Sequence, residues 1–150
     1  MMNLPASTKS PRPQAVPTPE GAPVVLVAED HDDTRFLLKM LLNYRGLAVV
    51  EARNGEEAVE VAGRELPALI MMDGSLPLLD GFAATRRMRA LAPLREVPIV
   101  FLSGHADQNS QAAAREAGCD EYMTKPLDTA LLDRILSRRL ARAGAPGEAV

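Results

Sequence analysis

Residues 68–81 read ALIMMDGSLPLLDG, a short apolar run that ends in a carboxylate and a loop. The run is typical of a buried strand, and Asp73 follows it directly. Pro77 and the Asp80-Gly81 pair then break the chain before the next helix can begin. A carboxylate at the tip of a buried strand is a common position for chemistry in α/β proteins. Taken alone, the pattern also fits an acidic residue that merely ends a strand.

The rest of the chain alternates between strand patterns and helix patterns. In the helix predicted for 34–44, Phe36, Leu37, Met40 and Leu41 recur at helical spacing, and in the helix predicted for 81–91 we expect Leu91 to point inward. The predicted strands are 24–28, 47–52, 68–73, 99–102 and 120–124, and the other predicted helices are 55–65, 107–117 and 129–140.

Five strands alternating with five helices predict βαβ units and an α/β fold, a doubly wound parallel five-stranded sheet. Right-handed crossovers place helices on both faces of the sheet and bring the carboxyl end of every strand to one edge. Side chains that follow different strands should therefore meet at that edge. They are Glu29 and Asp30, Asp73, Ser103 and Lys125.

Such a set of side chains favours phosphoryl chemistry at Asp73. Three neighbouring carboxylates repel one another unless a cation joins them, and hard oxygen ligands with an incomplete shell suit Mg²⁺. A carboxylate between that cation and Lys125 can act as a nucleophile toward phosphorus, with Ser103 and the Gly74 amide donating to the phosphoryl oxygens. The alternative is a buried Asp73–Lys125 ion pair without turnover, which leaves the acidic pair Glu29-Asp30 unrelieved.

The chain resembles the receiver domain of two-component response regulators from about residue 24 to about residue 140. Four motifs carry the resemblance in order and at the spacing of that family: VLVAED (25–30), DGSLPLLDG (73–81), Ser103-Gly104, and AGCDEYMTKP (117–126). The resemblance implies a (βα)5 fold with strand order 2-1-3-4-5.

The same resemblance implies a metal site around the phosphoacceptor Asp73. Asp30 and Asp73 would bind Mg²⁺ directly, together with the backbone carbonyl of Ser75. Glu29 would reach the metal through water.

For the phosphoryl group, the resemblance implies contacts to Ser103 and Lys125. The Lys125-Pro126 peptide bond is expected to be cis, which only proline makes inexpensive. Tyr122 matches the position of the switch aromatic that would follow Ser103 on phosphorylation. The alternative for Tyr122 is a half-buried ring that simply packs on the sheet edge.

Positions that vary within the family are interpreted separately. Ser75 and His105 lie two residues beyond Asp73 and Ser103, and we hypothesise that they set the lifetime of the acyl phosphate. His105 also fits a solvated loop histidine. We interpret His31, just past the acidic pair, as a surface residue rather than a ligand.

Length and composition indicate one domain with tails. We expect a proline-rich disordered tail at 1–23, the receiver domain at 24–142 and a disordered tail at 143–150. The formal net charge of -3 gives no support for nucleic-acid binding, and no apolar stretch is long enough for a membrane span. The single Cys119 fits a reducing compartment, so we expect a cytoplasmic protein.

The sequence thus predicts a stand-alone receiver that is not a classical enzyme. It would take phosphate from a sensor histidine kinase or a histidine phosphotransfer protein docked beside the first helix. It would signal through the face formed by helix 107–117, the fifth strand and the last helix, where Arg134, Arg138 and Arg142 favour an acidic partner. Three alternatives stay open: an aspartyl-nucleophile phosphatase, which usually has a second acid where Ser75 stands; a nucleotide or flavin binder, which lacks its Gly-rich loop here; and a receiver that binds partners without being phosphorylated.

Overall fold

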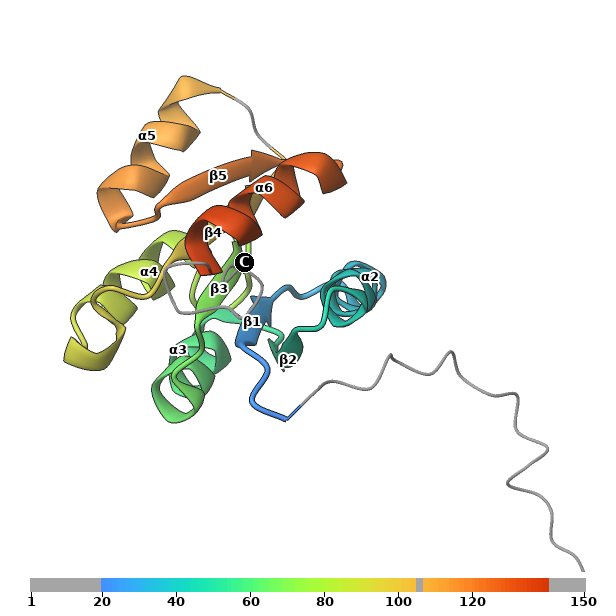
Figure 1. The fold of residues 1–150 in the computed structure, drawn as a ribbon. Helices are drawn as coiled ribbons and strands as arrows, with labels where there is room; N and C mark the ends of the chain where they lie inside the picture. The colour runs from blue at the N-terminus through green and yellow to red at the C-terminus, as the bar shows by residue number, and fades with distance from the viewer. Residues whose placement is uncertain (1–19, 105–106, 141–150) are drawn as a thin grey trace, which may run out of the picture.

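The computed structural model describes residues 20–104 and 107–140, and within them strands and helices alternate (Figure 1). The elements are β1 (Val24–Ala28), α2 (Asp32–Tyr44), β2 (Ala48–Ala52), α3 (Gly55–Glu65), β3 (Leu69–Asp73), α4 (Gly81–Arg89), the 3-10 helix η1 (Ala92–Leu94), β4 (Ile99–Ser103), α5 (Gln108–Ala117), β5 (Glu121–Thr124) and α6 (Thr129–Leu140). None of the helices in these ranges has the length and apolar character of a membrane span. The predicted tails lie outside these ranges, apart from residues 20–23.

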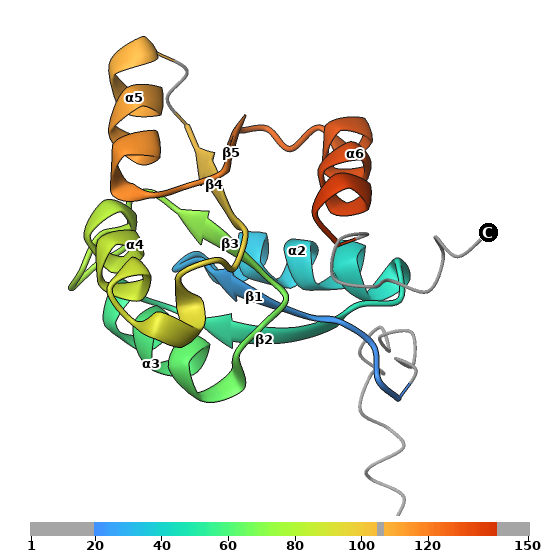
Figure 2. The ribbon, with the colours of Figure 1, turned by 60° about the vertical axis from the view of Figure 1, so that its left-hand side comes forward.

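The five strands form one sheet in the order β2-β1-β3-β4-β5, and every neighbouring pair is parallel. The predicted doubly wound α/β fold and its strand order are therefore confirmed. Apolar side chains of α3, α4 and α5 pack on one face, around Met72 and Phe101. Those of α2 and α6 pack on the other face, around Met71 and Leu102 (Figure 2). Alternate residues of each strand thus enter two separate cores.

Helix α2 turns a different side to the sheet from the one its spacing suggested. Leu38 and Leu42 are buried, whereas Phe36 is 49% exposed and Leu37 is 54% exposed. Apolar residues occupy more than half of the helix circumference, so periodicity alone does not select the buried side. The helix also begins at Asp32, two residues earlier than predicted, because His31 takes the N-cap position.

The predicted inward position of Leu91 is wrong. Helix α4 ends at Arg89, and Leu91 is 42% exposed. Pro93 has no backbone N–H and cannot continue an α helix, so the chain turns through η1 and buries Leu94 instead.

The N-terminus of α4 approaches the end of β3 more closely than a side chain allows. The Gly81 amide donates to the Gly74 carbonyl over 3.2 Å, and Asp80 caps the helix by accepting from the Ala83 amide. A Cβ atom on Gly81 would lie 2.4 Å from the Asp73 carbonyl oxygen. Glycine at this position therefore lets the helix close the loop that carries Asp73.

We predict that Gly81→Ala lowers the free energy of unfolding by about 1–3 kcal/mol, the range typical of overpacking. Gly63→Ala is the matched control, because a Cβ there meets nothing within 4 Å and alanine is the better helix former. The control should be stabilised by about 0.5–1 kcal/mol. Urea denaturation measures both values, and equal midpoints for the two variants would contradict the close approach.

Candidate functional site

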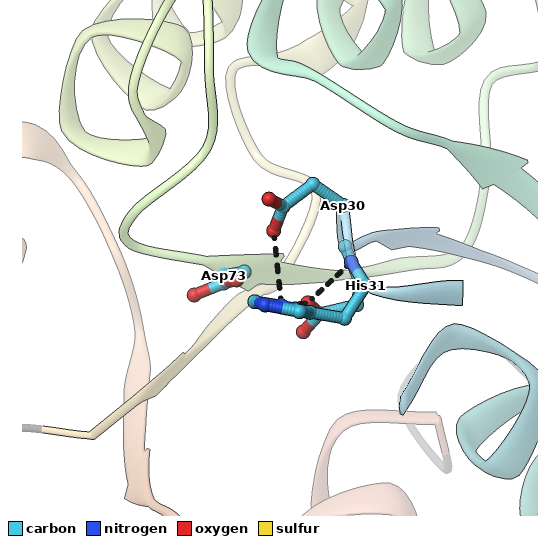
Figure 3. Close-up of side chains that lie close together, drawn as sticks. Asp30, His31 and Asp73 are labelled. Carbon is cyan, nitrogen blue, oxygen red and sulfur yellow. Dashed lines mark hydrogen bonds and ion pairs between the residues drawn. The ribbon is translucent and has the colours of Figure 1, made fainter. Parts of the chain in front are cut away.

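Acidic side chains from two adjacent strands meet at the carboxyl edge of the sheet. Glu29 and Asp30 follow β1, and Asp73 ends β3. One ligand atom from each of them, together with one from His31, can be chosen so that all four lie within 4.8 Å of one another. Figure 3 shows Asp30, His31 and Asp73 gathered at these strand ends, with the His31 ring extending toward Asp73.

Two of these carboxylates are withdrawn from water. Glu29 is fully buried, Asp73 is 3% exposed, and the side chain of Asp30 is 30% exposed. The buried oxygens Asp30 Oδ1 and Asp73 Oδ2 accept no hydrogen bond from any residue that the structure describes. Buried carboxylate oxygens without donors are costly, so these two oxygens indicate a place for a bound cation.

Lys125 provides the positive charge that the sequence predicted at this edge. Its Nζ lies 3.4 Å from Glu29 Oε1 and 3.7 Å from Asp73 Oδ2. The Lys125 amide donates to the Ser103 carbonyl over 2.8 Å, which fixes the end of β5 against β4. The Lys125-Pro126 peptide bond is cis, as the resemblance implied.

The pKa values of the two buried carboxyl groups, Glu29 and Asp73, shift in opposite directions. Burial raises the pKa of Glu29, but hydrogen bonds from the His31 amide and ring and the charge of Lys125 outweigh burial and bring the pKa below its usual value. Burial also raises the pKa of Asp73, and the charge of Glu29 adds to this. The Ser75 amide and Lys125 oppose the increase without cancelling it, so the pKa of Asp73 stays above its usual value. Without a cation, therefore, the neighbouring donors stabilise the ionised form of Glu29, whereas the ionised form of Asp73 is disfavoured.

The loop after Asp73 directs backbone groups toward the site. The Ser75 amide donates to Asp73 Oδ1 over 3.2 Å, and the Ser75 hydroxyl lies 3.5 Å from the same oxygen. The Gly74 amide makes a long bond of 3.4 Å to the Leu102 carbonyl. Asp73 pairs with Leu102 in the sheet, so Ser103, which is 7% exposed, follows the direct neighbour of Asp73.

The predicted switch residue Tyr122 lies on β5 and is half-buried. Its ring stacks on Phe101 with 6.3 Å between centroids, and Phe101 in turn contacts Phe82 of α4 at 5.0 Å. The sequence reasoning did not find this aromatic row. The predicted lifetime residue His105 lies outside the described ranges.

His31 is the site residue that the sequence interpretation missed. Its side chain is 73% exposed, yet Nδ1 lies 3.1 Å from Glu29 Oε2 and 3.4 Å from Asp30 Oδ1. The His31 amide also donates to Glu29 Oε2 over 3.0 Å. The hydrogen bond with Glu29 and the negative charges of Asp30 and Glu29 raise the pKa of His31. The available signal was its position in the chain, directly after two acids that end a strand.

Arg35 holds the backbone of the acidic pair Glu29-Asp30 through a hydrogen bond to the Glu29 carbonyl, and the sequence interpretation also missed this residue. It is 5% exposed, and its guanidinium donates to the Glu29 carbonyl over 2.9 Å and to Glu51 over 3.0 Å. A second ion pair joins it to Asp32. A buried arginine with this many acceptors fixes the backbone from which Glu29 projects.

These contacts fit a hard divalent cation. The donor set holds carboxylate oxygens from two strands, and two of the oxygens accept no hydrogen bond from residues 20–104 or 107–140. Mg²⁺ takes one or two carboxylates and keeps several waters, which matches a partly open oxygen site.

The comparisons with known proteins agree with this geometry. The family model described as the response regulator receiver domain matches residues 25–137, so the chain belongs to that family. DivK, a polar-differentiation response regulator of Brucella anthropi, is 30% identical over 103 residues, which are 69% of this chain and 84% of DivK. Three curated transcriptional regulators that it matches are longer, and the chain spans 52%, 50% and 48% of their lengths.

Solved receiver structures share the fold. The receiver domain of the sensor histidine kinase PA1611 from Pseudomonas aeruginosa is 35% identical, with a TM-score of 0.76 over 81% of this chain and 99% of that one. That structure has a magnesium ion coordinated in its active site cleft. The Saccharomyces cerevisiae receiver of Ssk1, solved in complex with the histidine phosphotransfer protein Ypd1, is 27% identical, with a TM-score of 0.74 over 79% of this chain and 88% of that one.

We predict that Asp73→Asn stabilises the cation-free protein at neutral pH by about 1 kcal/mol. An acid whose pKa is higher in the folded state stabilises the fold fully below its unfolded pKa, and loses that contribution as pH rises through the folded pKa. Removing the charge of Asp73 abolishes this loss.

Urea denaturation with a chelator, at acidic and neutral pH, measures the effect. Asp133→Asn is the control. Asp133 is exposed on α6 and pairs with Arg45, and the pKa of its carboxyl is lowered rather than raised. If Asp73→Asn were no more stable than the wild type at neutral pH, the repulsion at the site would be disproved.

Proposed function

We propose that this receiver accepts a phosphoryl group from a phosphohistidine donor onto Asp73 with Mg²⁺ bound, and signals by phosphorylation-dependent contact with a protein partner. The observation that carries the proposal is the position of Asp73. Its carboxylate is buried beside Glu29 and within 3.7 Å of the Lys125 ammonium, and its Oδ2 accepts no hydrogen bond from the described residues. The lone pairs of that oxygen are therefore available to phosphorus or to a cation.

The chemistry is a phosphoryl transfer between two nucleophiles. A carboxylate oxygen of Asp73 bonds to phosphorus while the bond from phosphorus to the donor imidazole breaks, and the imidazole leaves with the electron pair. When bound by Asp30 and Asp73, with Glu29 behind them, Mg²⁺ would neutralise charge on the phosphoryl oxygens. Lys125 would contact the same group, with the Ser103 hydroxyl donating a hydrogen bond to it.

The amide of Gly74 is a second donor for the phosphoryl group. Its bond to the Leu102 carbonyl is 3.4 Å long, and such a long bond costs little to exchange for an anionic acceptor. A Cβ on Gly74 would make only ordinary contacts, 3.6 Å to Phe101 and 3.7 Å to Phe82, so a small side chain would fit there without displacing either ring.

A phosphatase is the alternative from another class. It would use the same Asp73 nucleophile but would need an acid near the position where Ser75 stands. A receiver that binds partners without phosphorylation is the other alternative, and it gives no reason for two buried carboxylate oxygens that accept no hydrogen bond within the described part of the chain. The same experiment separates all three.

We predict that acetyl phosphate with Mg²⁺ adds one phosphoryl group to the wild type and none to Asp73→Asn. Intact-protein mass spectrometry measures the addition, and Asp133→Asn, which alters an exposed partner of Arg45 rather than a residue of the site, should label like the wild type. Continuous release of phenol from an aryl phosphate would favour the phosphatase instead. Absence of label on the wild type with acetyl phosphate and with a phosphohistidine donor would contradict the proposal.

Helix α2 offers a docking surface for the phosphodonor. Phe36 and Leu37 are about half exposed on α2, the helix that follows the acidic pair in the chain. Exposed large apolar side chains on a helix are common in protein interaction sites. In the Ypd1–Ssk1 complex a phosphotransfer protein binds a receiver that resembles this chain. A histidine kinase or phosphotransfer protein is therefore the partner we propose for this surface.

We predict that Leu37→Glu slows phosphotransfer from a phosphorylated histidine phosphotransfer protein about tenfold or more, the effect of losing about 1.4 kcal/mol of docking energy. Labelling by acetyl phosphate, which needs no docking, should be unchanged. Leu66→Glu is the matched control, since Leu66 is 53% exposed at the far end of α3. Equal transfer rates for both variants would exclude α2 as the donor surface.

The output surface is proposed on α5, β5 and α6. Arg134 is exposed there, whereas Arg138 pairs with Glu121 of β5 at 3.1 Å. The surface is therefore less basic than the sequence suggested, and Arg142 lies outside the described ranges. A change at Tyr122 would alter this surface directly, because Tyr122 and Glu121 are neighbours on β5. The stand-alone form of the protein stays a prediction.

A further inference from the structure

A nitrogen ligand stands beside the carboxylates of the proposed cation site. Nδ1 of His31 lies 3.1 Å from Glu29 Oε2 and 3.4 Å from Asp30 Oδ1. Ligands around one cation have similar separations, since each lies about 2.0–2.2 Å from the metal. The imidazole, which makes a hydrogen bond with Glu29 at this distance, therefore also lies at a separation that a ligand of the same cation would have (Figure 3).

The backbone holds His31 in this position. His31 is the N-cap of α2 in extended conformation, with φ -83° and ψ 121°. Its amide donates to Glu29 Oε2, the same oxygen that its ring faces. Arg35, one turn further along the helix, binds the Glu29 carbonyl. The ring thus approaches the acids from a fixed strand end and a fixed helix start, so little order is gained or lost when a cation arrives.

A separate observation shows that the protein groups do not satisfy the site. Asp30 Oδ1 and Asp73 Oδ2 are buried and receive no hydrogen bond from the described residues. Asp73 as a whole is only 3% exposed. Lys125 compensates one negative charge of the three. A cation bound to one carboxylate oxygen from each acid would be within reach of a His31 nitrogen as well, since one ligand atom from each of the four residues lies within 4.8 Å of the others.

We propose that His31 supplies a nitrogen ligand to this cation site, so that the site takes late first-row divalent ions such as Co²⁺, Ni²⁺ and Zn²⁺ in addition to Mg²⁺. The inference deepens the proposed function, because it rests on the same carboxylates. Neutral imidazole is a good ligand for late first-row ions, whereas Mg²⁺ prefers oxygen and keeps its waters. His31 therefore sets which metal the site prefers and contributes little to Mg²⁺ affinity.

The test compares Co²⁺ with Mg²⁺ on tag-free protein by isothermal titration calorimetry. His31→Asn keeps a side-chain amide that can donate to Glu29 but removes the imidazole. We expect the variant to bind Co²⁺ about tenfold or more weakly, the scale on which ligand environments change metal affinity, and to bind Mg²⁺ within about twofold of the wild type. Equal Co²⁺ affinity in the two proteins would overturn the inference, and so would a parallel loss of Mg²⁺ affinity.

Nuclear magnetic resonance of the histidine side chains identifies the ligand directly. The sequence contains two histidines, so His105→Asn leaves His31 as the sole imidazole. We expect Zn²⁺ to shift the Nδ1 resonance of His31 in the wild type and in His105→Asn. A shift that disappears in His105→Asn would assign the nitrogen ligand to the other histidine and overturn the inference.

Asp30→Asn separates this inference from the proposed function. This substitution should weaken the binding of both Co²⁺ and Mg²⁺, because Asp30 supplies an oxygen ligand to the proposed shared site. Suppose that Mg²⁺ binding and acetyl phosphate labelling persist while the Co²⁺ affinity is the same in His31→Asn and in the wild type. The proposed nitrogen ligand is then wrong, and the receiver function stands. If the wild type binds neither ion, the proposed magnesium site fails and the nitrogen ligand fails with it.

Discussion

The repulsion between the buried carboxylates of Glu29 and Asp73 is the interaction on which the site depends. Both groups are almost completely withdrawn from water, and Lys125 lies close to both, at 3.4 Å and 3.7 Å. One ammonium cannot neutralise two buried charges together with that of Asp30. The fold therefore holds Asp73 in an environment where a bound cation would relieve the repulsion between the carboxylates.

The parallel sheet imposes this arrangement. Lys125 and Glu29 are 96 residues apart in the chain, yet the order β2-β1-β3-β4-β5 ends their strands at one edge. Glycine at position 81 then lets α4 close against the Asp73 loop. Stability of the two apolar cores thus maintains a cluster of charges that would separate in a less rigid structure. The aromatic row from Phe82 to Tyr122 connects the same loop with the surface on β5.

Much of the fold and of the carboxylate cluster could be predicted because β1, β3 and β4 are short apolar runs that end in, or directly before, a polar side chain. Topology then brings Asp73 and Lys125 together without any knowledge of contacts. The side of α2 that packs on the sheet could not be predicted, since Phe36, Leu37, Leu38 and Leu42 fit several orientations equally well. The contact of His31 with the acids depends on backbone angles at a helix N-cap, which composition and periodicity do not encode.

Carbon-13 nuclear magnetic resonance of the Asp73 carboxyl, titrated with acid, tests the central claim most directly. In chelator, the pKa of Asp73 should lie above the usual value for aspartate, because of burial and the charge of Glu29. Saturating Mg²⁺ should lower it, since a bound cation favours the ionised form. An ordinary pKa in chelator, or one that does not respond to Mg²⁺, would contradict the account.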